Sequence, residues 1–285
     1  MRFAYSTNIF RLRPLAEAVE GIAKGGFGAV EIIADHPHAL PEEVGAAEAA
    51  ELSQLLEKLK MKVCNLNSSF VGTLGDAHNP SWLEEDWQHR ERRIRYTLDC
   101  LRLAAAMGIP HVSTMPGGPI PDTMNQEDAW RLFVANMHRV LPLAKKIGAG
   151  LLIDPSPEML IETSEQALAF LKEFEFNEYL RINFDVGHFF SIGEDPCSSW
   201  EKLKPYTLHV HLDDIASGKG HRHVQLGEGA VDIPSFLDCV RESGYEGYVT
   251  IKLDSYDQRA EEAVLLSAHY LQERGFLSGG RESGN

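Results

Sequence analysis

Residues 181–188 read Arg-Ile-Asn-Phe-Asp-Val-Gly-His, and residues 208–214 read Leu-His-Val-His-Leu-Asp-Asp. Each segment is a short apolar run that ends in carboxylates and histidines. Because side chains alternate between the two faces of a strand, the polar residues of each segment share one face. Both segments are therefore predicted to be core strands with a polar inward face, which carries Asn183 and Asp185 in the first strand and His209, His211 and Asp213 in the second.

Polar side chains on the inward face of a core strand are costly unless they are paired or bind a metal. Two such strands side by side would bring Asp185, His188 and His211 within reach of one ion. The competing interpretation is that each histidine is a hydrogen-bonded core residue. The occurrence of Asp-x-x-His and His-x-His-x-Asp at the ends of two apolar strands favours a functional site.

The composition is that of a globular protein. The chain has 285 residues, of which 44% are hydrophobic and 24% charged. This length fits either two ordinary domains or one barrel of the α/β class. The formal net charge of -15 repels phosphate backbones, so a nucleic-acid partner is not expected. A small anionic substrate remains compatible with this charge, because a local pocket can be positive.

The cysteines and the two ends of the chain predict a cytoplasmic protein. No Cys-x-x-Cys pair occurs, so we expect reduced, buried thiols at Cys64, Cys100, Cys197 and Cys239. Residues 1–5 enter a predicted strand directly, which leaves no room for a signal peptide, and no apolar run approaches the length of a membrane span. The predicted domain is residues 1–277, and the polar residues 278–285 are expected to form a flexible tail.

Short apolar runs alternate with helical patterns along the whole chain, which predicts parallel βα units. The predicted strands are residues 3–6, 29–33, 62–66, 111–114, 151–154, 180–185, 208–211 and 248–253. The predicted helices are residues 14–24, 48–59, 89–107, 126–147, 164–174, 200–203, 233–242 and 260–274. Units in this number and length predict a single (β/α)₈ TIM barrel. A doubly wound sheet would require a Gly-rich phosphate turn after an early strand, and the sequence has none.

Active sites of such barrels lie at the C-terminal ends of the strands. The polar residues that close the predicted strands form the candidate ring, namely Asn8, Glu31, Asn65, Asn67, His111, Asp154, Asp185, His188, His211, Asp213, Lys252 and Asp254. Carboxylate oxygens and imidazole nitrogens together suit a divalent ion such as Mn²⁺, Co²⁺, Mg²⁺ or Zn²⁺. The later segment with His221 and His223 either brings two imidazoles to one side or is a solvated loop.

Several motifs resemble those of the sugar phosphate isomerase/epimerase superfamily. These proteins are the xylose isomerase-like TIM barrels, which include the AP endonucleases of the endonuclease IV type. The similarity runs over nearly the full chain. It is carried by Leu-Leu-Ile-Asp-Pro-Ser-Pro-Glu at 151–158, Asn-Phe-Asp-Val-Gly-His at 183–188, His-Val-His-Leu-Asp-Asp at 209–214, Leu-Gly-Glu-Gly at 226–229, Val-Asp-Ile-Pro at 231–234 and Gly-Tyr-Glu-Gly-Tyr-Val-Thr-Ile at 244–251. This combination is specific to the superfamily and not to one of its reactions.

The resemblance implies one divalent ion, held by a Glu after strand five, an Asp after strand six, a His after strand seven and a Glu after strand eight. Asp185 and His211 match this pattern, whereas Asp154 and Lys252 stand where the two glutamates are expected. Asp254 lies two residues beyond Lys252 and is expected to share its inward face and to act as a further ligand. The ammonium of Lys252 would repel an ion, act as a base if deprotonated, or pair with Asp154 or Asp185.

The implied activity is that of a metal-dependent isomerase or epimerase of a sugar or sugar phosphate, which transfers a proton next to a carbonyl group. The expected catalytic residues are Asp154, Lys252 and His188. The expected substrate-binding residues are Glu158, His188, His223, Glu228 and Asn67. The alternatives are a dehydratase of the inosose or dehydroshikimate type, and a non-catalytic barrel in which Lys252 replaces a metal ligand.

One motif argues against DNA repair. The fourth predicted strand is followed by Met115-Pro116-Gly117, where the AP endonucleases show His-Pro-Gly. Together with the acidic net charge, this difference leaves a small-molecule sugar as the expected partner, with no nucleic acid and no membrane. The resemblance also allows a homo-oligomer.

Overall fold

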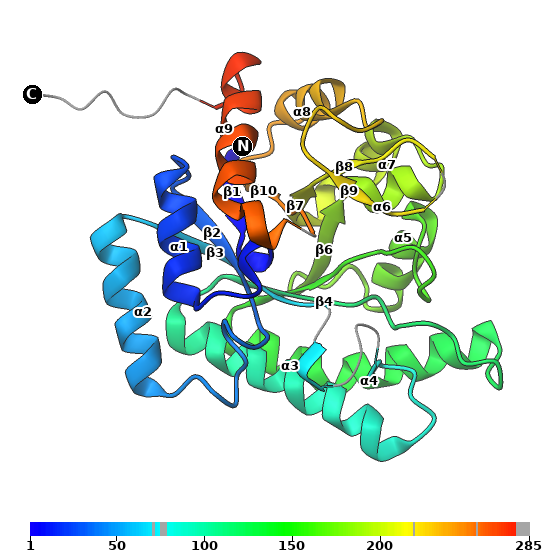
Figure 1. The fold of residues 1–285 in the computed structure, drawn as a ribbon. Coiled ribbons are helices and arrows are strands. Elements are labelled where there is room, and N and C mark those ends of the chain that lie inside the picture. The colour runs from blue at the N-terminus through cyan, green and yellow to red at the C-terminus, as the bar shows by residue number, and fades with distance from the viewer. Residues whose placement is uncertain (70–71, 75–78, 219, 255, 278–285) are drawn as a thin grey trace, which may run out of the picture.

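The computed structural model describes residues 1–69, 72–74, 79–218, 220–254 and 256–277 (Figure 1). Its strands form a closed parallel barrel in the order β1-β10-β7-β6-β5-β4-β3-β2, which confirms the predicted (β/α)₈ architecture. The barrel strands are β1 (Arg2–Ser6), β2 (Ala29–Ile33), β3 (Lys62–Ser68), β4 (His111–Thr114), β5 (Gly150–Ile153), β6 (Leu180–Asp185), β7 (Thr207–Leu212) and β10 (Tyr248–Ile251). The predicted tail, residues 278–285, lies outside the described residues.

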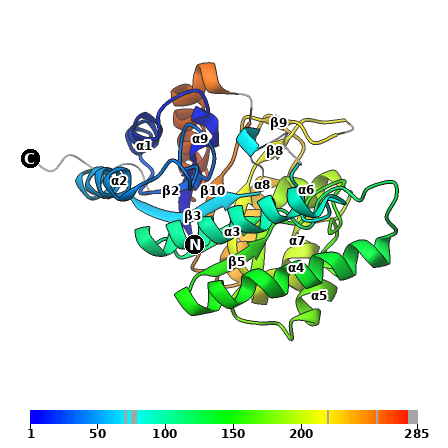
Figure 2. The same cartoon turned by 90° about the horizontal axis from the view of Figure 1, so that it is seen from below.

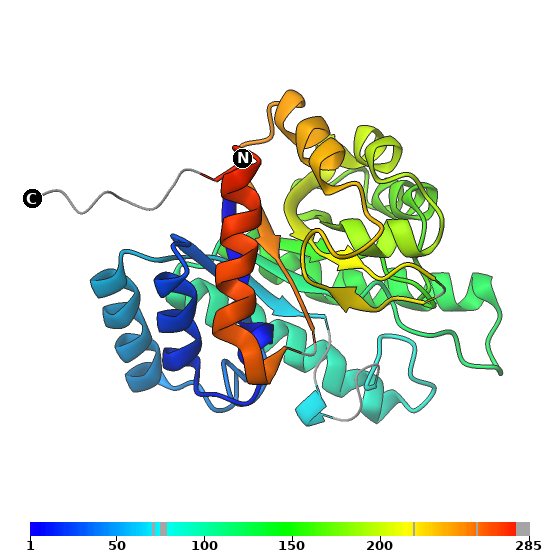
Figure 3. The same ribbon diagram turned by 45° about the horizontal axis from the view of Figure 1, so that its top comes forward.

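The helices lie on the outside of the barrel and cover it on all sides (Figures 1 and 2). They are α1 (Leu15–Lys24), α2 (Ala46–Leu59), α3 (Trp87–Met107), α4 (Gln126–Ile147), α5 (Ser164–Glu173), α6 (Val186–Ser191), α7 (Pro196–Leu203), α8 (Ile233–Glu242) and α9 (Ala260–Glu273). Short 3₁₀ helices occur at Thr7–Phe10, Gly72–Leu74, Lys204–Tyr206 and Asp257–Arg259. In the tilted view α9 lies in front of the barrel, beside α1 (Figure 3).

The alternation of β6 divides its side chains as the sequence predicts. Phe184 points outward and stacks on Phe236 with ring centroids 5.6 Å apart, while Trp200 packs edge-on at 5.5 Å. All three rings are almost fully buried, so the outer face of β6 is covered by α7 and α8. Burial of this apolar surface fixes the strand's rotation and therefore directs Asn183 and Asp185 into the barrel.

Several local elements differ from the prediction. Helix α6 was not predicted, and α7 begins at Pro196 rather than at residue 200. Strands β8 (Asp214–Ile215) and β9 (His223–Val224) form a small antiparallel pair that extends beyond β7. Such short elements depend on tertiary contacts and leave no periodic pattern in the sequence.

The prediction of four reduced thiols is wrong for two of the cysteines. Cys197 on α7 and Cys239 on α8 form a disulfide, whereas Cys64 and Cys100 are free and buried. The sequence places these two cysteines 42 residues apart, and only the packing of α7 against α8 brings them together. No described helix is long and apolar enough to cross a membrane.

Candidate active site

Three side chains meet at the carboxylate of Asp185. Its Oδ2 atom lies 3.2 Å from Nζ of Lys252, 3.3 Å from Nδ1 of His211 and 3.5 Å from Nε2 of His188. Asp185 is on β6, His211 on β7 and His188 on α6, and Lys252 directly follows β10, so the closed barrel is what brings them together. The structure therefore places Asp185, His188 and His211 in one cluster.

Asp185 has a second role at the junction of β6 and α6. It is the N-cap of α6, and its Oδ1 accepts a hydrogen bond from the backbone N–H of His188 at 3.1 Å. An N-cap carboxylate satisfies a free backbone donor of the first helical turn. The short helix thereby holds His188 directly above the end of the strand.

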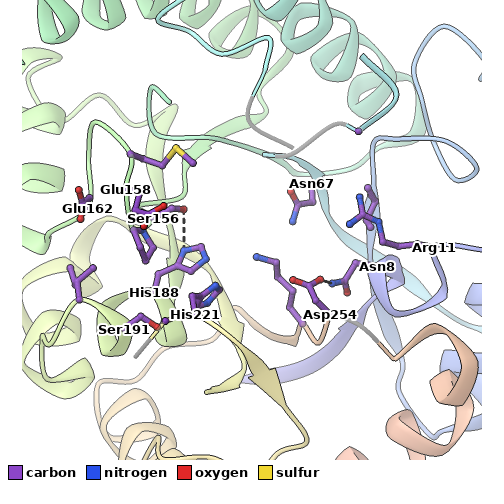
Figure 4. Close-up of a pocket in the computed structure, with 17 residues that line it drawn as sticks. Asn8, Arg11, Asn67, Ser156, Glu158, Glu162, His188, Ser191, His221 and Asp254 are labelled. Atoms are coloured by element: carbon purple, nitrogen blue, oxygen red, sulfur yellow. Dashed lines mark hydrogen bonds between the residues drawn. The ribbon is translucent and has the colours of Figure 1, made fainter. Parts of the chain in front are cut away.

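The ring of His188 is oriented by the segment that follows β5. Its Nδ1 lies 2.9 Å from the carbonyl oxygen of Pro155 and 3.1 Å from Oγ of Ser156 (Figure 4). Because a carbonyl oxygen only accepts, Nδ1 carries the proton and Nε2 is the basic nitrogen of the neutral ring.

A second layer lies beneath this cluster. Nε2 of His211 contacts Oε2 of Glu31 at 2.7 Å, and Nε2 of His209 lies 3.2 Å from the same oxygen. Glu31 also accepts hydrogen bonds from Asn65 at 2.8 Å and Asn67 at 3.2 Å. Since Glu31 is on β2 and the histidines are on β7, these contacts cross the interior of the barrel.

The pKa values in both layers follow from these contacts. Burial alone would lower the pKa of His211, but the Glu31 carboxylate reverses the effect and raises it to about 10. Burial would raise the pKa of Glu31, yet His211 and His209 hold it well below its usual range. In the same way Asp185 and Asp154 raise the pKa of His188 against its burial.

Lys252 is the buried cation at this end of the barrel. Burial would lower the pKa of its ammonium, but Asp185, followed by Asp154, raises that pKa above its usual range. His188, followed by the same ion pair, holds the pKa of Asp185 well below its usual range although burial acts in the opposite direction. The Lys252 side chain is therefore charged at neutral pH.

Asp154 follows β5 and is fully buried. Its Oδ2 lies 3.8 Å from Nδ1 of His211 and accepts a hydrogen bond from Ser69 at 3.4 Å. Its Oδ1 lies 3.4 Å from Nδ1 of His188 but has no hydrogen-bond partner among the described residues. The structure thus brings Asp154 into the cluster of Asp185 and His211.

A separate group forms around Asp213. Its Oδ2 lies 3.2 Å from Nε2 of His223 and 3.5 Å from Nε2 of His221, and the two imidazole nitrogens are 3.2 Å apart. The backbone N–H of Gly187 donates to Oδ1 of Asp213 at 2.8 Å. The β8–β9 pair holds the segment that contains His221 and His223. Of the two alternatives for this segment, the structure shows the first, because both imidazoles lie beside one carboxylate.

A cavity of about 660 Å³ opens at the C-terminal ends of the strands. Asn8, Arg11, Asn67 and Asp254 line one side of it, and Ser156, Glu158, Glu162, His188, Ser191 and His221 line the other (Figure 4). Lys252 also lines this cavity, whereas Asp154, Asp185 and His211 do not. A ligand in the cavity therefore meets His188 and Lys252, and the three other residues support them from below.

The remaining predicted residues have various positions. Asn67 and Glu158 line the cavity, whereas His223 and the exposed Glu228 are not among its lining residues. His111 begins β4 and therefore lies at the N-terminal end of the barrel, so its expected place at the mouth is wrong. Burial lowers its pKa to about 4.

Asp254 was expected to bind an ion together with Asp185, but it points elsewhere. Its Oδ1 accepts a hydrogen bond from Asn8 at 2.6 Å, and its Oδ2 lies 3.8 Å from Nδ1 of His223. Among the described residues, the group of possible metal ligands around Asp185 and His211 includes Asp154 and not Asp254. The side chain of Asp254 instead forms part of the cavity wall.

Side-chain groups able to hold a divalent ion are present, including Asp154, Asp185 and His211, whose ligand atoms lie within 4.8 Å of one another. The fourth expected ligand, however, is replaced by Lys252. Two unit charges 4 Å apart repel by about 4 kcal/mol at an effective dielectric constant of about 20, and a divalent ion doubles this value. These four side chains do not fit the four-ligand site that the resemblance implies.

Sequence reasoning identified most of the cluster but missed some partners. Glu31 was predicted at the mouth but lies in the layer beneath the cluster, and its contact with His211 across the barrel was not predicted. Ser156, which orients His188, was not identified. The available signals were a charged residue inside an apolar strand for Glu31, and the position of Ser156 in the segment that follows a barrel strand.

Comparison with known proteins agrees with this architecture. The model of the xylose isomerase-like TIM barrel family matches residues 19–274. The uncharacterised protein MJ1311 of Methanocaldococcus jannaschii is 25% identical over 270 residues, which cover 88% of this chain and 83% of that protein. Fructoselysine 3-epimerase of Escherichia coli O157:H7 is 22% identical over 271 residues, which cover 84% and 86% of the two chains.

Two further similarities are to a dehydratase and to a solved structure. Inosose dehydratase of Lacticaseibacillus casei is 20% identical over 163 residues, which cover 51% of this chain and 54% of that enzyme. The crystal structure of the IolI protein with a bound zinc atom superimposes with a TM-score of 0.79 at 18% identity, over 98% of this chain and 100% of that one. At this identity the structural likeness shows the fold alone.

Proposed function

The chain belongs to the xylose isomerase-like TIM barrel family, and we propose that it is an enzyme that moves a proton next to the carbonyl group of a sugar or a related polyhydroxy compound. One observation carries this proposal. His188 and Lys252 both line the cavity, and both contact the same oxygen of Asp185, at 3.5 and 3.2 Å. An imidazole exchanges protons near neutral pH, and an ammonium stabilises negative charge on oxygen.

The proposed step is an enolisation. Nε2 of neutral His188 removes a proton from the carbon next to the carbonyl, and the electron pair of that C–H bond forms a carbon–carbon double bond. The carbonyl oxygen becomes an enolate oxygen, to which the ammonium of Lys252 donates a hydrogen bond. Delivery of a solvent proton to the opposite face of the same carbon, with release of the first proton from His188 to solvent, gives an epimer. Return of the first proton to the former carbonyl carbon, with transfer of the hydroxyl proton between the two oxygens, gives an isomer.

The cavity lining supports a substrate with several hydroxyl groups. Asn8, Asn67, Ser156 and Asp254 offer donors and acceptors on opposite sides of the cavity. The described lining contains one lysine and one arginine, Lys252 and Arg11, and Arg11 lies 3.9 Å from a carboxylate oxygen of Asp35. This balance favours an uncharged sugar over a sugar phosphate.

The expected divalent ion has no step in this proposal, because the residues of the cluster do not fit it. Asp154 and Asp185 act here through His188, whose two ring nitrogens lie 3.4 and 3.5 Å from their carboxylates. Asp154 is thus a positioning residue in this proposal rather than a proton carrier.

A dehydratase is the second candidate. It begins with the same proton removal and then expels a hydroxyl group from the next carbon, which the protonated His188 can assist. The raised pKa of His188 favours this acid form, since Asp185 and Asp154 outweigh the effect of burial. The similarity to inosose dehydratase supports this candidate over half of the chain.

The test is proton exchange in D₂O. The protein is incubated with a panel of ketoses, keto-inositols and dehydroshikimate, and the products are examined by NMR and mass spectrometry. Deuterium uptake next to the carbonyl without loss of water supports an isomerase or epimerase, and loss of water supports a dehydratase. Absence of exchange with every compound would contradict the proposal. Lys202→Met on α7, at an exposed ion pair with Glu165 on α5, is the control variant.

A further inference from the structure

We infer that Lys252 supplies, as part of the chain, the positive charge that the resemblance assigns to a divalent ion, and that no ion binds at Asp154, Asp185 and His211. The role of this charge in the reaction rests on the proposed function. The claim about ion binding rests on the arrangement of the side chains alone.

The backbone of Lys252 is held from two sides. Its N–H donates to the carbonyl oxygen of Leu212 at 3.0 Å, which continues the ladder between β10 and β7. Its carbonyl oxygen lies 3.0 Å from Nδ1 of His223. With the backbone fixed in this way and the side chain only 8% exposed, the ammonium is confined to the cluster and reaches Asp185 at 3.2 Å.

The cluster has no carboxylate left without a nitrogen neighbour. Glu31 contacts His211 and His209, Asp185 contacts Lys252, His211 and His188, and Asp154 lies beside His188 and His211. An ion bound to Asp185 would have to displace the ammonium or remain beside it. Both alternatives are unfavourable in a buried site, because a displaced ammonium loses its partner and a retained one repels the ion.

The cavity shows which positive charge a substrate would meet. Lys252 lines it, while Asp154, Asp185 and His211 do not. A carbonyl oxygen in the cavity therefore meets an ammonium group, and the three expected ligands are covered. A side chain that takes the place of an ion must lie between the substrate and the expected ligands, and Lys252 has this position.

The second departure from the expected pattern fits the first. Asp154 has one methylene fewer than the glutamate expected there, so its carboxylate reaches less far towards the centre. A lysine side chain, with four methylenes, extends further than the glutamate it replaces. The two changes shift the centre of positive charge from an ion between two glutamates to the end of one side chain.

The test measures Mn²⁺ binding by calorimetry on the full chain purified without chelator. A His221→Gln background removes two other groups of possible ligands from the measurement, namely Asp213, His221 and His223, and Asp185, His188 and His221. In this background we expect the parent to show no binding that depends on Asp185. Lys252→Glu should bind Mn²⁺ about 100-fold or more tightly, since it exchanges a repelling charge for a ligand, and Asp185→Asn should abolish this gain. Lys202→Glu on the surface is the control and should change nothing.

Two results would overturn the inference. One is stoichiometric binding of Mn²⁺ by the parent that Asp185→Asn removes, and the other is a folded Lys252→Glu protein that gains no binding. If Lys252→Glu does not fold, Lys252→Gln replaces it under the same criterion, with fold checked by circular dichroism. Where an active substrate is found, its exchange should be unchanged by EDTA. If no substrate exchanges but the binding results are as expected, the proposed function fails while the ion-binding claim stands.

Discussion

The ammonium nitrogen of Lys252 lies 3.2 Å from Oδ2 of Asp185, and Nε2 of His188 lies 3.5 Å from the same oxygen. One carboxylate therefore contacts both Lys252 and His188, the two residues of the cluster that line the cavity. Asp185 also caps α6, so the same residue fixes the start of that helix and the position of His188 in it.

Lys252→Met should slow deuterium exchange of an active substrate by about 10²–10³-fold, the range seen when one donor to a developing oxyanion is removed. The effect should appear mainly in kcat, since the charge acts on an oxygen that becomes negative during the step. Lys202→Met should exchange at the parent rate. An unchanged rate in Lys252→Met would show that the ammonium has no part in the reaction.

His188→Gln should reduce exchange by about 10²–10⁴-fold, the usual contribution of a positioned acid–base group. The pH profile provides a second measurement. Asp185 and Asp154 raise the pKa of His188 above 6.5 despite its burial. Because only the neutral ring removes a proton, the rate should rise with pH and level off above the raised pKa of His188. Asp154→Asn removes one of these carboxylates and should move the rise to lower pH. A profile that does not move would exclude His188 as the base.

Glu31→Gln should lower the free energy of unfolding by about 3–5 kcal/mol, because it removes the nearest carboxylate partner of the buried His211, at 2.7 Å. Urea denaturation measures this change. The double variant Glu31→Gln/His211→Gln should lose less than the sum of the two single variants, as expected for residues in contact. Glu165→Gln, at an exposed ion pair, should change stability by less than about 1 kcal/mol.

The same ion pair predicts how stability depends on pH. The pKa of His211 rises from 6.5 to about 10 in the folded chain, because Glu31 outweighs the effect of burial. A raised pKa means that the stabilisation is fully present below pH 6.5 and is lost as the pH rises towards 10. Between these limits His211 should contribute a fall of up to about 1.4 kcal/mol per pH unit. In His211→Gln the slope of stability against pH should be smaller by this amount, and an equal slope would contradict the ion pair.

Gly187→Ala should destabilise the protein by about 1–3 kcal/mol, the cost of an added methyl group in a packed interior. A Cβ at this position would lie 2.2 Å from Oδ2 of Asp213. Asp213 would have to move away, and it would lose the hydrogen bond from the Gly187 N–H. Gly28→Ala is the matched control because its Cβ would meet no atom within 4 Å. Thermal unfolding of the two variants compares them directly.

The sequence was sufficient for the barrel and for the side chains that follow its strands. Apolar runs of strand length between helical patterns identified every barrel strand, and alternation within β6 and β7 correctly turned Asp185 and His211 inward. The position of Lys252 followed from the same reasoning. These features depend on local periodicity, which a single sequence records.

Contacts across the barrel could not be predicted in the same way. The distance between Glu31 and His211 depends on the stagger of distant strands and on the choice of rotamer, neither of which has a local signal. The direction of Asp254 shows the same limit. Alternation places it on the face of Lys252, but the chain has already left β10 there, so the rule for strands no longer applies.

The contact between Glu31 and His211 has a consequence for whether the barrel can be divided. A fragment that ends after β4 would contain Glu31 without His209 and His211, and the complementary fragment would contain these two histidines without Glu31. Each half would then bury an unpaired charged or polar group at its centre, so neither should fold alone. Mixing the two fragments should restore structure only when they assemble, because the ion pair then forms between them.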